Sequence, residues 1–249
     1  MLKAVLFDLD NTLLLFDEQE FFKAYLPRIA RAFADLMPTN VFRERIMSAS
    51  QALLQNDGRS SNADYFMKIF SKGFEKRKIR MWDRFLEFYD EQFDDFRGLT
   101  TAIPEARDVA LKMKEEGFKV VIASNPFWPL RVQMKRLAWA GIEDIPYDHI
   151  THIENTSFLK PRPEYYANIS DEIDVNASEC MMVGNDPVND MIASTVGMKT
   201  YLTTDSRGID PSLSMSREIR DDISITIPDP DFTGPLRDVP QAVCSIDEI

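Results

Sequence analysis

A four-residue apolar run that ends in acidic residues is the feature that most constrains this chain. Residues 4–7 are all apolar, and Asp8-Leu9-Asp10-Asn11-Thr12 follows them directly. Such a run is typical of a strand buried in a parallel sheet, and ligands bind at the carboxyl edge of these sheets. Side chains two residues apart on an extended segment point the same way, so Asp8 and Asp10 can serve one reacting centre. The alternative is an Asx-type turn that simply ends the strand.

Further apolar runs alternate with helical patterns in the second part of the chain. The expected strands are residues 119–123, 149–153, 180–183 and 199–202, with a late edge strand at 223–227. The expected helices lie near 104–116, 130–140, 163–170 and 187–196. Alternation of this kind predicts a parallel sheet with right-handed crossovers and helices on both faces. The expected fold class is therefore α/β, with a Rossmann-like core.

Residues 17–97 have helical spacing and a high aromatic content. Eleven of the 17 phenylalanines fall in this block, and no strand-like run interrupts it. We therefore expect an inserted, all-helical domain with a core of its own, in which Pro27 breaks or kinks the first helix. The predicted boundaries are 17–97 for this domain, and 1–16 together with 98–249 for the α/β domain.

The composition excludes several classes of function. A formal net charge of −12 disfavours binding to nucleic acid or to an anionic membrane. Met1-Leu2-Lys3 leads directly into the first strand, so we expect no signal peptide. Cys180 and Cys244 match neither a disulfide framework nor a zinc site, which favours a cytoplasmic location. An acidic protein that binds an anionic substrate needs a local cation, which points toward a metal.

Three further polar motifs follow the later strands. Ser124-Asn125 comes after the second expected strand, Lys160 before Pro161 after the third, and residues 184–190 after the fourth. A hydroxyl at a helix N-terminus suits an anion. An ammonium on a proline-stiffened loop suits a transferring phosphoryl group. The alternatives are that Ser124 caps the next helix and that Lys160 is solvated.

Two acids lie in the last of these motifs. Asp186 before Pro187 fits a helix N-cap with proline at the first helical position, but that role leaves Asp190, one turn later, unexplained. Two hard oxygen ligands facing Asp8 and Asp10 would form a Mg²⁺ site.

Taken together, the four motifs resemble the haloacid dehalogenase superfamily, in its order and over residues 1–203. The resemblance implies that Asp8 is the nucleophile, which becomes an aspartyl phosphate. It implies that Asp10 protonates the leaving oxygen and then deprotonates water, and that Lys160 ties the nucleophile to the phosphate. The phosphoryl oxygens would be bound by Thr12, Ser124 and Asn125.

The same resemblance implies a Mg²⁺ cofactor held by Asp8, by the backbone carbonyl of Asp10 and by Asp186, with Asp190 in support. One position is ambiguous, because the family places the metal-binding acid directly after the glycine, where this chain has Asn185. We favour Asp186, because a dication gains more from a carboxylate than from a neutral amide. The alternative is that Asn185 binds the metal and Asp186 only caps the helix.

Asp10 also bears on the type of reaction. Dehalogenases of this superfamily lack an acid two residues after the nucleophile, whereas phosphatases and phosphomutases have it. The helical block resembles the first-position cap of the superfamily, which predicts hydrolysis of a small phosphomonoester. Arg59, in the polar loop 55–61, is a candidate substrate contact, although an ordinary solvated loop is the alternative. A phosphomutase, or a catalytically silent binding or regulatory module, remain the other candidates, and the oligomeric state stays open.

Overall fold

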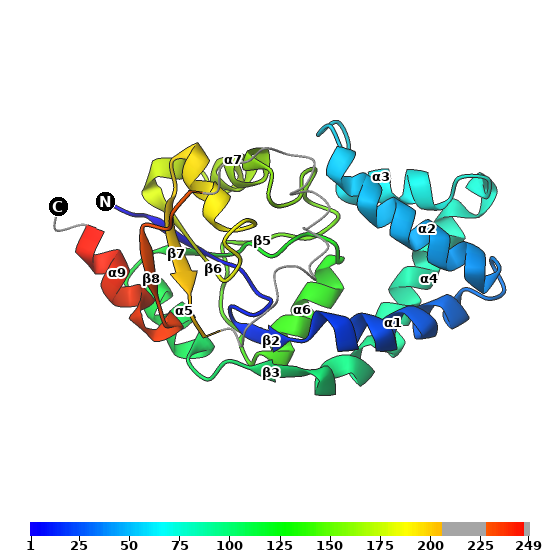
Figure 1. Ribbon diagram of the computed structural model, residues 1–249, viewed down its shortest axis with the longest axis horizontal. Helices are drawn as coiled ribbons and strands as arrows, with labels where there is room; N and C mark the ends of the chain where they lie inside the picture. The colour runs from blue at the N-terminus through cyan, green and yellow to red at the C-terminus, as the bar shows by residue number, and fades with distance from the viewer. Residues whose placement is uncertain (206–227, 247–249) are drawn as a thin grey trace.

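A six-stranded parallel sheet forms the centre of the protein, as seen in a computed structural model that describes residues 1–205 and 228–246 (Figure 1). The strand order is β5-β4-β1-β6-β7-β8. The bounds are β1 Ala4–Phe7, β4 Lys119–Ile122, β5 His149–Ile150, β6 Cys180–Gly184, β7 Lys199–Thr203 and β8 Phe232–Gly234. The predicted α/β class is confirmed. The expected edge strand at 223–227 lies outside the described residues.

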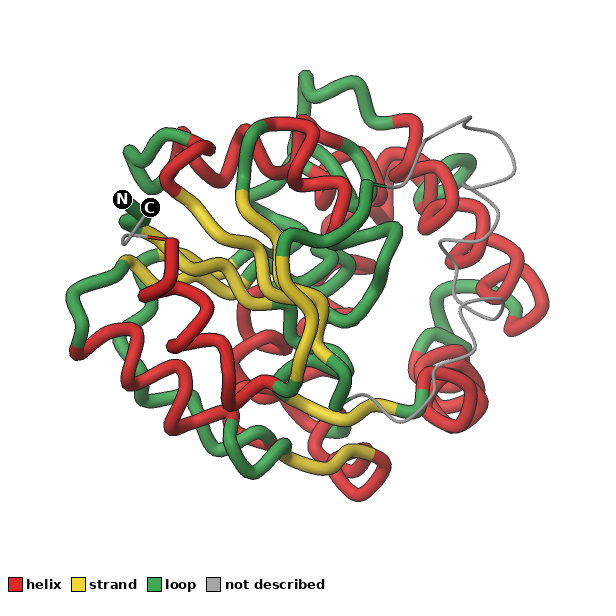
Figure 2. The backbone as a smooth tube through the Cα atoms, turned by 60° about the vertical axis from the view of Figure 1, so that its left-hand side comes forward, coloured by secondary structure: helices red, strands yellow, loops and turns green. Residues whose placement is uncertain are grey.

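Alternation along the strands gives each face of the sheet its own core. In β1, Val5 and Phe7 belong to one buried cluster, and Ala4 and Leu6 belong to the other. The first cluster is covered by helices α5 (Ala106–Glu115), α6 (Leu130–Trp139) and α9 (Val239–Ile246). The second is covered by α7 (Pro163–Glu172) and the 3₁₀ helix η5 (Met191–Val196). Figure 2 shows helices on both sides of the strands.

The register of the central strands brings the polar motifs to one edge. Phe7, the last residue of β1, pairs with Ile122 of β4 and with Val183 of β6. The residues that follow these three strands therefore emerge side by side. The chain runs from β1 to one neighbour and later returns to the other, so this edge is also the switch point where ligands bind in open α/β sheets.

Between the antiparallel strands β2 (Leu14–Phe16) and β3 (Thr100–Ala102), every regular element is a helix. We call residues 17–99 the helical insertion. Its elements are α1 Glu18–Ala32, α2 Thr39–Ala52, η1 Leu53–Gln55, α3 Asn62–Phe70, η2 Glu75–Arg77, α4 Lys78–Glu91 and η3 Phe93–Leu99. Figure 1 shows them beside the carboxyl edge of the sheet.

The structure bears on two expectations about the insertion. Pro27 lies inside α1 and does not break it, since the helix keeps a buried face with Phe21, Tyr25 and Ile29 despite the lost backbone N–H. The insertion has an aromatic core of its own, in which Phe33, Phe42, Phe70 and Phe85 pack on one another, and this core is continuous with the buried cluster on one face of the sheet. Phe93 stacks on Trp139 of α6, with ring centroids 5.1 Å apart.

Two elements of the α/β domain are shorter or tighter than expected. The strand predicted over 149–153 is only His149–Ile150, because the Thr151 hydroxyl turns to the carbonyls of Ile122 and Ser124. The helix predicted over 187–196 is a turn followed by η5. There the Asp190 carboxylate folds back onto the Asp186 backbone N–H at 2.9 Å.

Candidate active site

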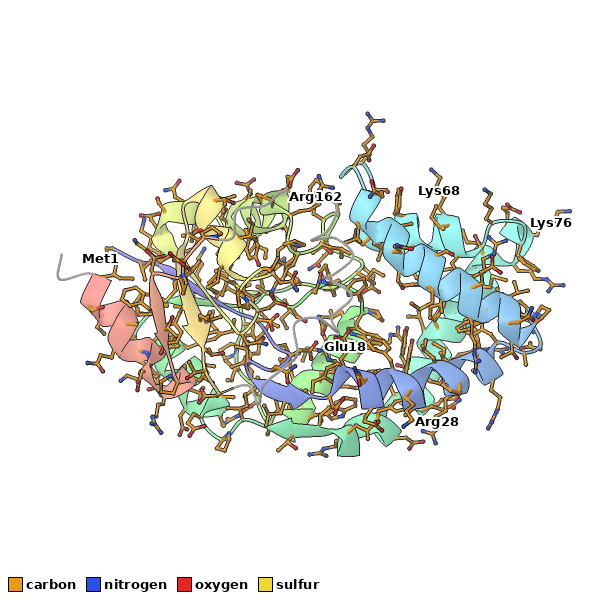
Figure 3. The ribbon with its side chains drawn as sticks, in the orientation of Figure 1. Met1, Glu18, Arg28, Lys68, Lys76 and Arg162 are labelled. Atoms are coloured by element: carbon orange, nitrogen blue, oxygen red, sulfur yellow. The ribbon has the colours of Figure 1, made fainter. Side chains whose placement is uncertain are left out.

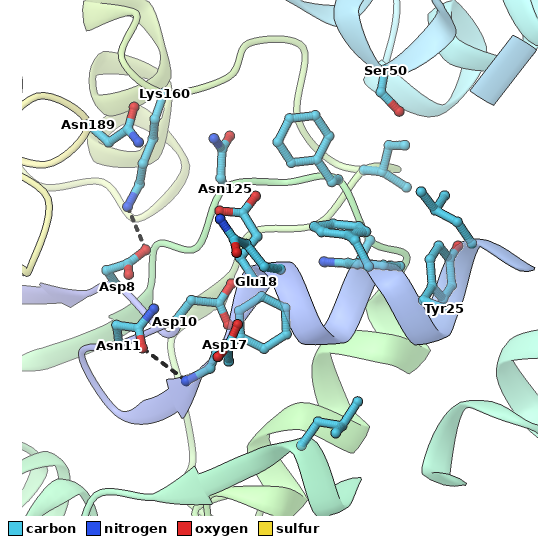
Figure 4. Close-up of a pocket in the computed structure, with 18 of the residues that line it drawn as sticks. Asp8, Asp10, Asn11, Asp17, Glu18, Tyr25, Ser50, Asn125, Lys160 and Asn189 are labelled. Atoms are coloured by element: carbon cyan, nitrogen blue, oxygen red, sulfur yellow. Dashed lines mark hydrogen bonds and ion pairs between the residues drawn. The ribbon is translucent and has the colours of Figure 1, made fainter. Parts of the chain in front are cut away.

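A buried chain of charges lies at the carboxyl edge of the sheet. The Lys160 Nζ is 2.8 Å from an oxygen of Asp8 and 2.6 Å from an oxygen of Asp190. All three side chains are buried, and the Lys160 and Asp190 side chains are each 1% exposed. Figure 4 shows Lys160 reaching toward Asp8 from the loop above. The structure thus brings together three residues that lie up to 182 positions apart in the sequence.

Burial dominates the electrostatics of this group. It raises the pKa of Asp8 to about 7, and the negative charges of Asp190 and Asp10 add to the effect while Lys160 opposes it. The pKa of Asp190 is also raised by burial. Burial alone would lower the pKa of Lys160, but Asp190 and Asp8 outweigh it and hold that pKa well above its usual range. Lys160 is therefore a fixed cation between two carboxylates that are costly to ionise.

Gly184 explains how Asp190 reaches this position. A Cβ at residue 184 would stand 2.1 Å from a carboxylate oxygen of Asp190, far inside the van der Waals limit. Only glycine leaves the space for Asp190 to fold under the end of β6, where it meets both Lys160 and the Asp186 backbone N–H. The glycine of the fourth motif is thus required by packing against a side chain.

Asp10 has a partner that the sequence did not reveal. Arg136 of α6 donates to an Asp10 carboxylate oxygen, and its guanidinium is almost completely buried. Gln133, one turn earlier, accepts from the same guanidinium at 2.6 Å and donates to the Thr151 carbonyl. Arg136 is therefore a positioning residue that fixes one oxygen of Asp10. The sequence did contain a signal for this contact, because Gln133 and Arg136 are polar residues on the otherwise apolar helix face of Val132 and Leu137.

The two candidate metal ligands in the fourth motif have different surroundings. The Thr12 hydroxyl donates to the Asn185 amide oxygen at 3.1 Å and stands 3.5 Å from an Asp8 oxygen. The Asp186 carboxylate instead accepts from the backbone N–H groups of Val188 and Asn189, at 2.8 and 3.0 Å. Asn185 is thus linked to Asp8, while Asp186 closes its own turn.

The second motif contributes in two ways. The side chain of Asn125 lines the cavity described below, and its buried amide oxygen has no hydrogen-bond partner among the described residues. Ser124 is buried beside it, and its backbone carbonyl accepts from Thr151 and from the Tyr165 hydroxyl at 2.7 and 2.8 Å. This buried acceptor can therefore take a hydrogen bond from a donor on a ligand in the cavity.

The structure does not bring Arg59 to the site. Its side chain is 88% exposed and ion-pairs with Asp57. The contact with the α/β domain is made by Asn62, the first residue of α3, whose amide donates to Thr156 and to the Phe158 carbonyl. Arg162 reinforces the contact by donating to the Asn56 carbonyl at 2.6 Å. The loop therefore supports the segment that carries Lys160 without placing Arg59 near Asp8.

A cavity of about 850 Å³ extends from Asp8, Asp10 and Lys160 into the helical insertion. Glu18, in the first turn of α1, lines it and faces the space between the sheet and the insertion, while Lys68 and Lys76 lie on the outer side (Figure 3). Burial raises the pKa of Glu18 to about 7, with smaller contributions from Asp10 and Asp186. The cavity volume of about 850 Å³ lies within the ~300–1,000 Å³ range that is typical of small-molecule sites.

The raised pKa of Glu18 predicts a pH-dependent effect on stability. Between pH 4.5 and about 7 the Glu18 carboxyl is ionised in the unfolded chain but still protonated in the folded protein, so the stability of the folded state falls as the pH rises through this range. Glu18→Gln, measured in EDTA, should therefore leave Tm unchanged at pH 4.5 and raise it by roughly 3–8 °C at pH 8. Glu20→Gln, on the exposed side of the same helix, is the control and should shift Tm by less than about 1 °C. An equal gain at both pH values would show that Glu18 is not the titrating group.

The side chains at this edge fit a hard divalent cation by their chemistry. Asp8, Asn185 and Asp186 offer oxygen atoms, and all three line the cavity. Over residues 1–205 and 228–246, no three acidic, histidine or cysteine side chains already converge on one point. A cation here would therefore rely on amide, backbone or substrate oxygens as well as carboxylates.

Among residues 1–205 and 228–246, no helix is long and apolar enough to cross a membrane.

Comparison with known proteins places these motifs in a family. Residues 2–194 match the haloacid dehalogenase-like hydrolases. Ribulose-1,5-bisphosphate 5-phosphatase of Halopiger xanaduensis is 25% identical over 240 residues, which is 87% of this chain and 91% of that protein. The putative pyrophosphatase PpaX of Caldanaerobacter subterraneus is 21% identical over 79% of each chain.

Solved structures share the whole architecture. A HAD phosphatase from Thermococcus onnurineus superposes with a TM-score of 0.56 and 20% identity, covering 97% of this chain and 98% of that one. L-2-haloacid dehalogenase of Xanthobacter autotrophicus, with chloropropionic acid covalently bound, superposes with a TM-score of 0.53 and 19% identity, covering 99% of this chain and 100% of that one. The family resemblance of the four motifs is confirmed, and the chain belongs to the haloacid dehalogenase-like hydrolases.

Proposed function

We propose that this protein is a Mg²⁺-dependent phosphatase that hydrolyses a small phosphomonoester through an aspartyl phosphate on Asp8. The observation that carries the proposal is the position of Asp8, which is buried at the end of β1, held by Lys160 at 2.8 Å, and open to the cavity. The phosphatases among its relatives support the same reaction class. Residues 17–97 are the proposed cap over this site.

Two chemical steps follow from the arrangement. An oxygen of Asp8 attacks phosphorus and the bond to the substrate alcohol breaks, while Asp10 gives its proton to the departing oxygen. Asp10 then takes a proton from water, whose oxygen attacks phosphorus and releases inorganic phosphate and the Asp8 carboxylate. Arg136 holds one Asp10 oxygen, which leaves the other for proton transfer. Lys160 neutralises charge on the nucleophile and the phosphoryl group.

Asp8, the backbone carbonyl of Asp10 and Asn185 are the proposed holders of Mg²⁺, which would supply further positive charge beside the phosphoryl group. The raised pKa of Asp8 supports a need for that charge, because a nucleophilic carboxylate must be ionised. Asn185 is preferred here over Asp186 because Thr12 links it to Asp8, while Asp186 is occupied by its own turn.

A matched pair of alanine variants tests this preference. Asn185→Ala should raise the Mg²⁺ concentration for half-maximal activity by at least ~10-fold and leave Tm unchanged. Asp186→Ala should raise that concentration less than about 3-fold, but lower stability by ~1 kcal/mol through loss of the turn contacts. The reverse ranking in a Mg²⁺ titration with thermal melts would return the metal to Asp186.

The role of Asp10 has its own test. Asp10→Asn should lower kcat for alkyl phosphates by at least ~10², because an alkoxide leaves slowly without a proton. The loss should be much smaller with p-nitrophenyl phosphate, whose leaving group needs no proton. Phosphate release in the presence of Mg²⁺ measures both, and an equal loss for the two substrates would assign Asp10 to a structural role.

The product formed by the wild-type protein separates the two candidate reactions. Appearance of an isomeric phosphate ester in place of free phosphate would identify a phosphomutase.

A further inference from the structure

The far end of the cavity is built from aromatic rings. Beyond Asp8, Asp10 and Lys160, the cavity passes between the sheet and the helical insertion. Six aromatic residues from the insertion and from the loop after β4 line this cavity: Phe22, Tyr25, Phe66, Trp82, Tyr89 and Trp128. Figure 4 shows Asp8 and Lys160 at one end and Tyr25 at the other. An alcohol part that extends along the cavity from a phosphate at Asp8 would therefore meet these rings.

We call these six residues the aromatic wall, in which several rings contact one another and the two tyrosine hydroxyls are paired. Phe22 of α1 and Trp128, which follows β4, lie nearly parallel, with ring centroids 6.4 Å apart and an interplanar angle of 12°. Trp128 also meets Tyr25 and Tyr89 edge-on, at 5.3 and 6.0 Å. The two tyrosine hydroxyls are buried and bond to each other at 3.0 Å. The wall consequently presents ring faces and edges, which bind planar apolar groups well.

The charge of the cavity disfavours a second anion on the substrate. Of the described residues that line it, Lys160 is the one with a basic side chain, and Asp8 and Asp190 already bind it. The acidic side chains in the same lining include Asp17, Glu18 and Asp186. A second phosphate reaching the ring-lined end would meet no cation among these residues. The Halopiger relative, in contrast, is named for a bisphosphate.

We propose that the substrate of this enzyme is a monophosphate whose alcohol part carries an uncharged planar ring, bound against the aromatic wall. The inference rests on the proposed phosphatase function, since it assumes that the phosphate sits at Asp8. It assigns substrate selection to the aromatic wall shared by the helical insertion and the loop after β4, and not to Arg59.

Three primary alkyl phosphates test the assignment without changing the leaving oxygen. With Mg²⁺ and the full chain, kcat/KM for 2-phenylethyl phosphate should exceed that for ethyl phosphate by at least ~30-fold, as expected for burial of a ring in an apolar pocket. Ethane-1,2-diyl bisphosphate should be no better than ethyl phosphate. Equal rates for the first two, within about 3-fold, or a preference for the bisphosphate, would overturn the proposal.

A pair of variants on one helix locates the effect. Trp82→Leu should lower the ratio of 2-phenylethyl to ethyl phosphate by at least ~5-fold, because it removes one ring of the wall. Ile79→Ala is the control on the same helix, since Ile79 is 78% exposed and does not line the cavity, and it should leave both rates unchanged. An unchanged ratio in Trp82→Leu would place the ring elsewhere and contradict the assignment.

Binding separates this inference from the proposed function. 3-Phenylpropylphosphonate and propylphosphonate cannot be hydrolysed, and calorimetry with the wild-type chain should give the phenyl compound an affinity at least ~30-fold higher. If no ester is hydrolysed but this difference appears, the phosphatase proposal fails and the ring site stands. If p-nitrophenyl phosphate is hydrolysed but the two phosphonates bind equally, the ring site fails and the phosphatase proposal stands.

Discussion

Asp8→Asn should abolish phosphate release, with a loss of at least ~10⁴-fold, while the fold is kept. The amide has the shape of the carboxylate but lacks the negative charge and the nucleophilic oxygen, so no covalent intermediate can form. Phosphate release from p-nitrophenyl phosphate with saturating Mg²⁺ measures the effect. Because Asp8 is buried beside Lys160, circular dichroism and a thermal melt are needed to check that the Asp8→Asn variant still folds.

An acyl-phosphate mimic provides a second measurement on the same variant. Beryllium fluoride should bind the wild-type chain in the presence of Mg²⁺, because it attaches to an ionised carboxylate, and it should fail to bind Asp8→Asn. Substantial activity of the variant, or equal binding of beryllium fluoride by both proteins, would rule out Asp8 as the phosphorylated residue.

Lys160→Met should cost both activity and stability. The substitution leaves Asp8 and Asp190 buried without their cation, and removing one partner of a buried ion pair typically costs about 3–5 kcal/mol. Activity should fall by at least ~10³-fold, because the charge that neutralises the nucleophile and the phosphoryl group is lost. Chemical denaturation and phosphate release measure the two effects.

The pH dependence of this variant has a definite sign. Burial already raises the pKa of both Asp8 and Asp190 in the wild-type protein, and without Lys160 both carboxyls should bind protons more readily still. The stability deficit of Lys160→Met, measured in EDTA, should therefore be largest at pH 8 and shrink as the pH falls toward 5. Lys3→Met breaks the exposed pair with Glu179 and should cost less than ~1 kcal/mol at both pH values. A deficit that does not change with pH would mean that lost packing, and not unpaired charge, is the cause.

The sequence by itself determined the type of fold and the edge of the sheet that carries the chemistry. Short apolar runs report buried parallel strands because both faces of such strands are covered, and the carboxyl ends of these strands meet at one edge. The predicted fold class and family follow from this local information. The same pattern places Asp8, Ser124 and Asn185 beyond three neighbouring strands, and the register of β1 with β4 and β6 brings them to one edge.

Sequence patterns gave wrong or incomplete predictions where a residue contacts a partner that is distant in the sequence. Pro27 stays inside α1 because tertiary packing holds its buried face, and residues 187–190 form a turn because Asp190 is drawn to Lys160. The aromatic residues of the insertion pack on one another as the sequence predicts, but Phe93 also stacks on Trp139 and so joins this core to one face of the sheet, which the sequence does not reveal. Spacing along the chain carries no information about such contacts.

Only the tertiary structure decided which side chains meet at the site. Arg136 lies 126 positions from Asp10, and its pairing depends on how α6 lies against the loop after β1. Asn185 and Asp186 are adjacent in the sequence, but their side chains have different partners. The backbone turn directs Asn185 toward Thr12 and Asp186 toward the backbone of its own loop. Arg59 is left in solvent because Asn62 makes the contact with the α/β domain. Each outcome depends on the orientation of packed elements, which the periodicity of a single segment does not record.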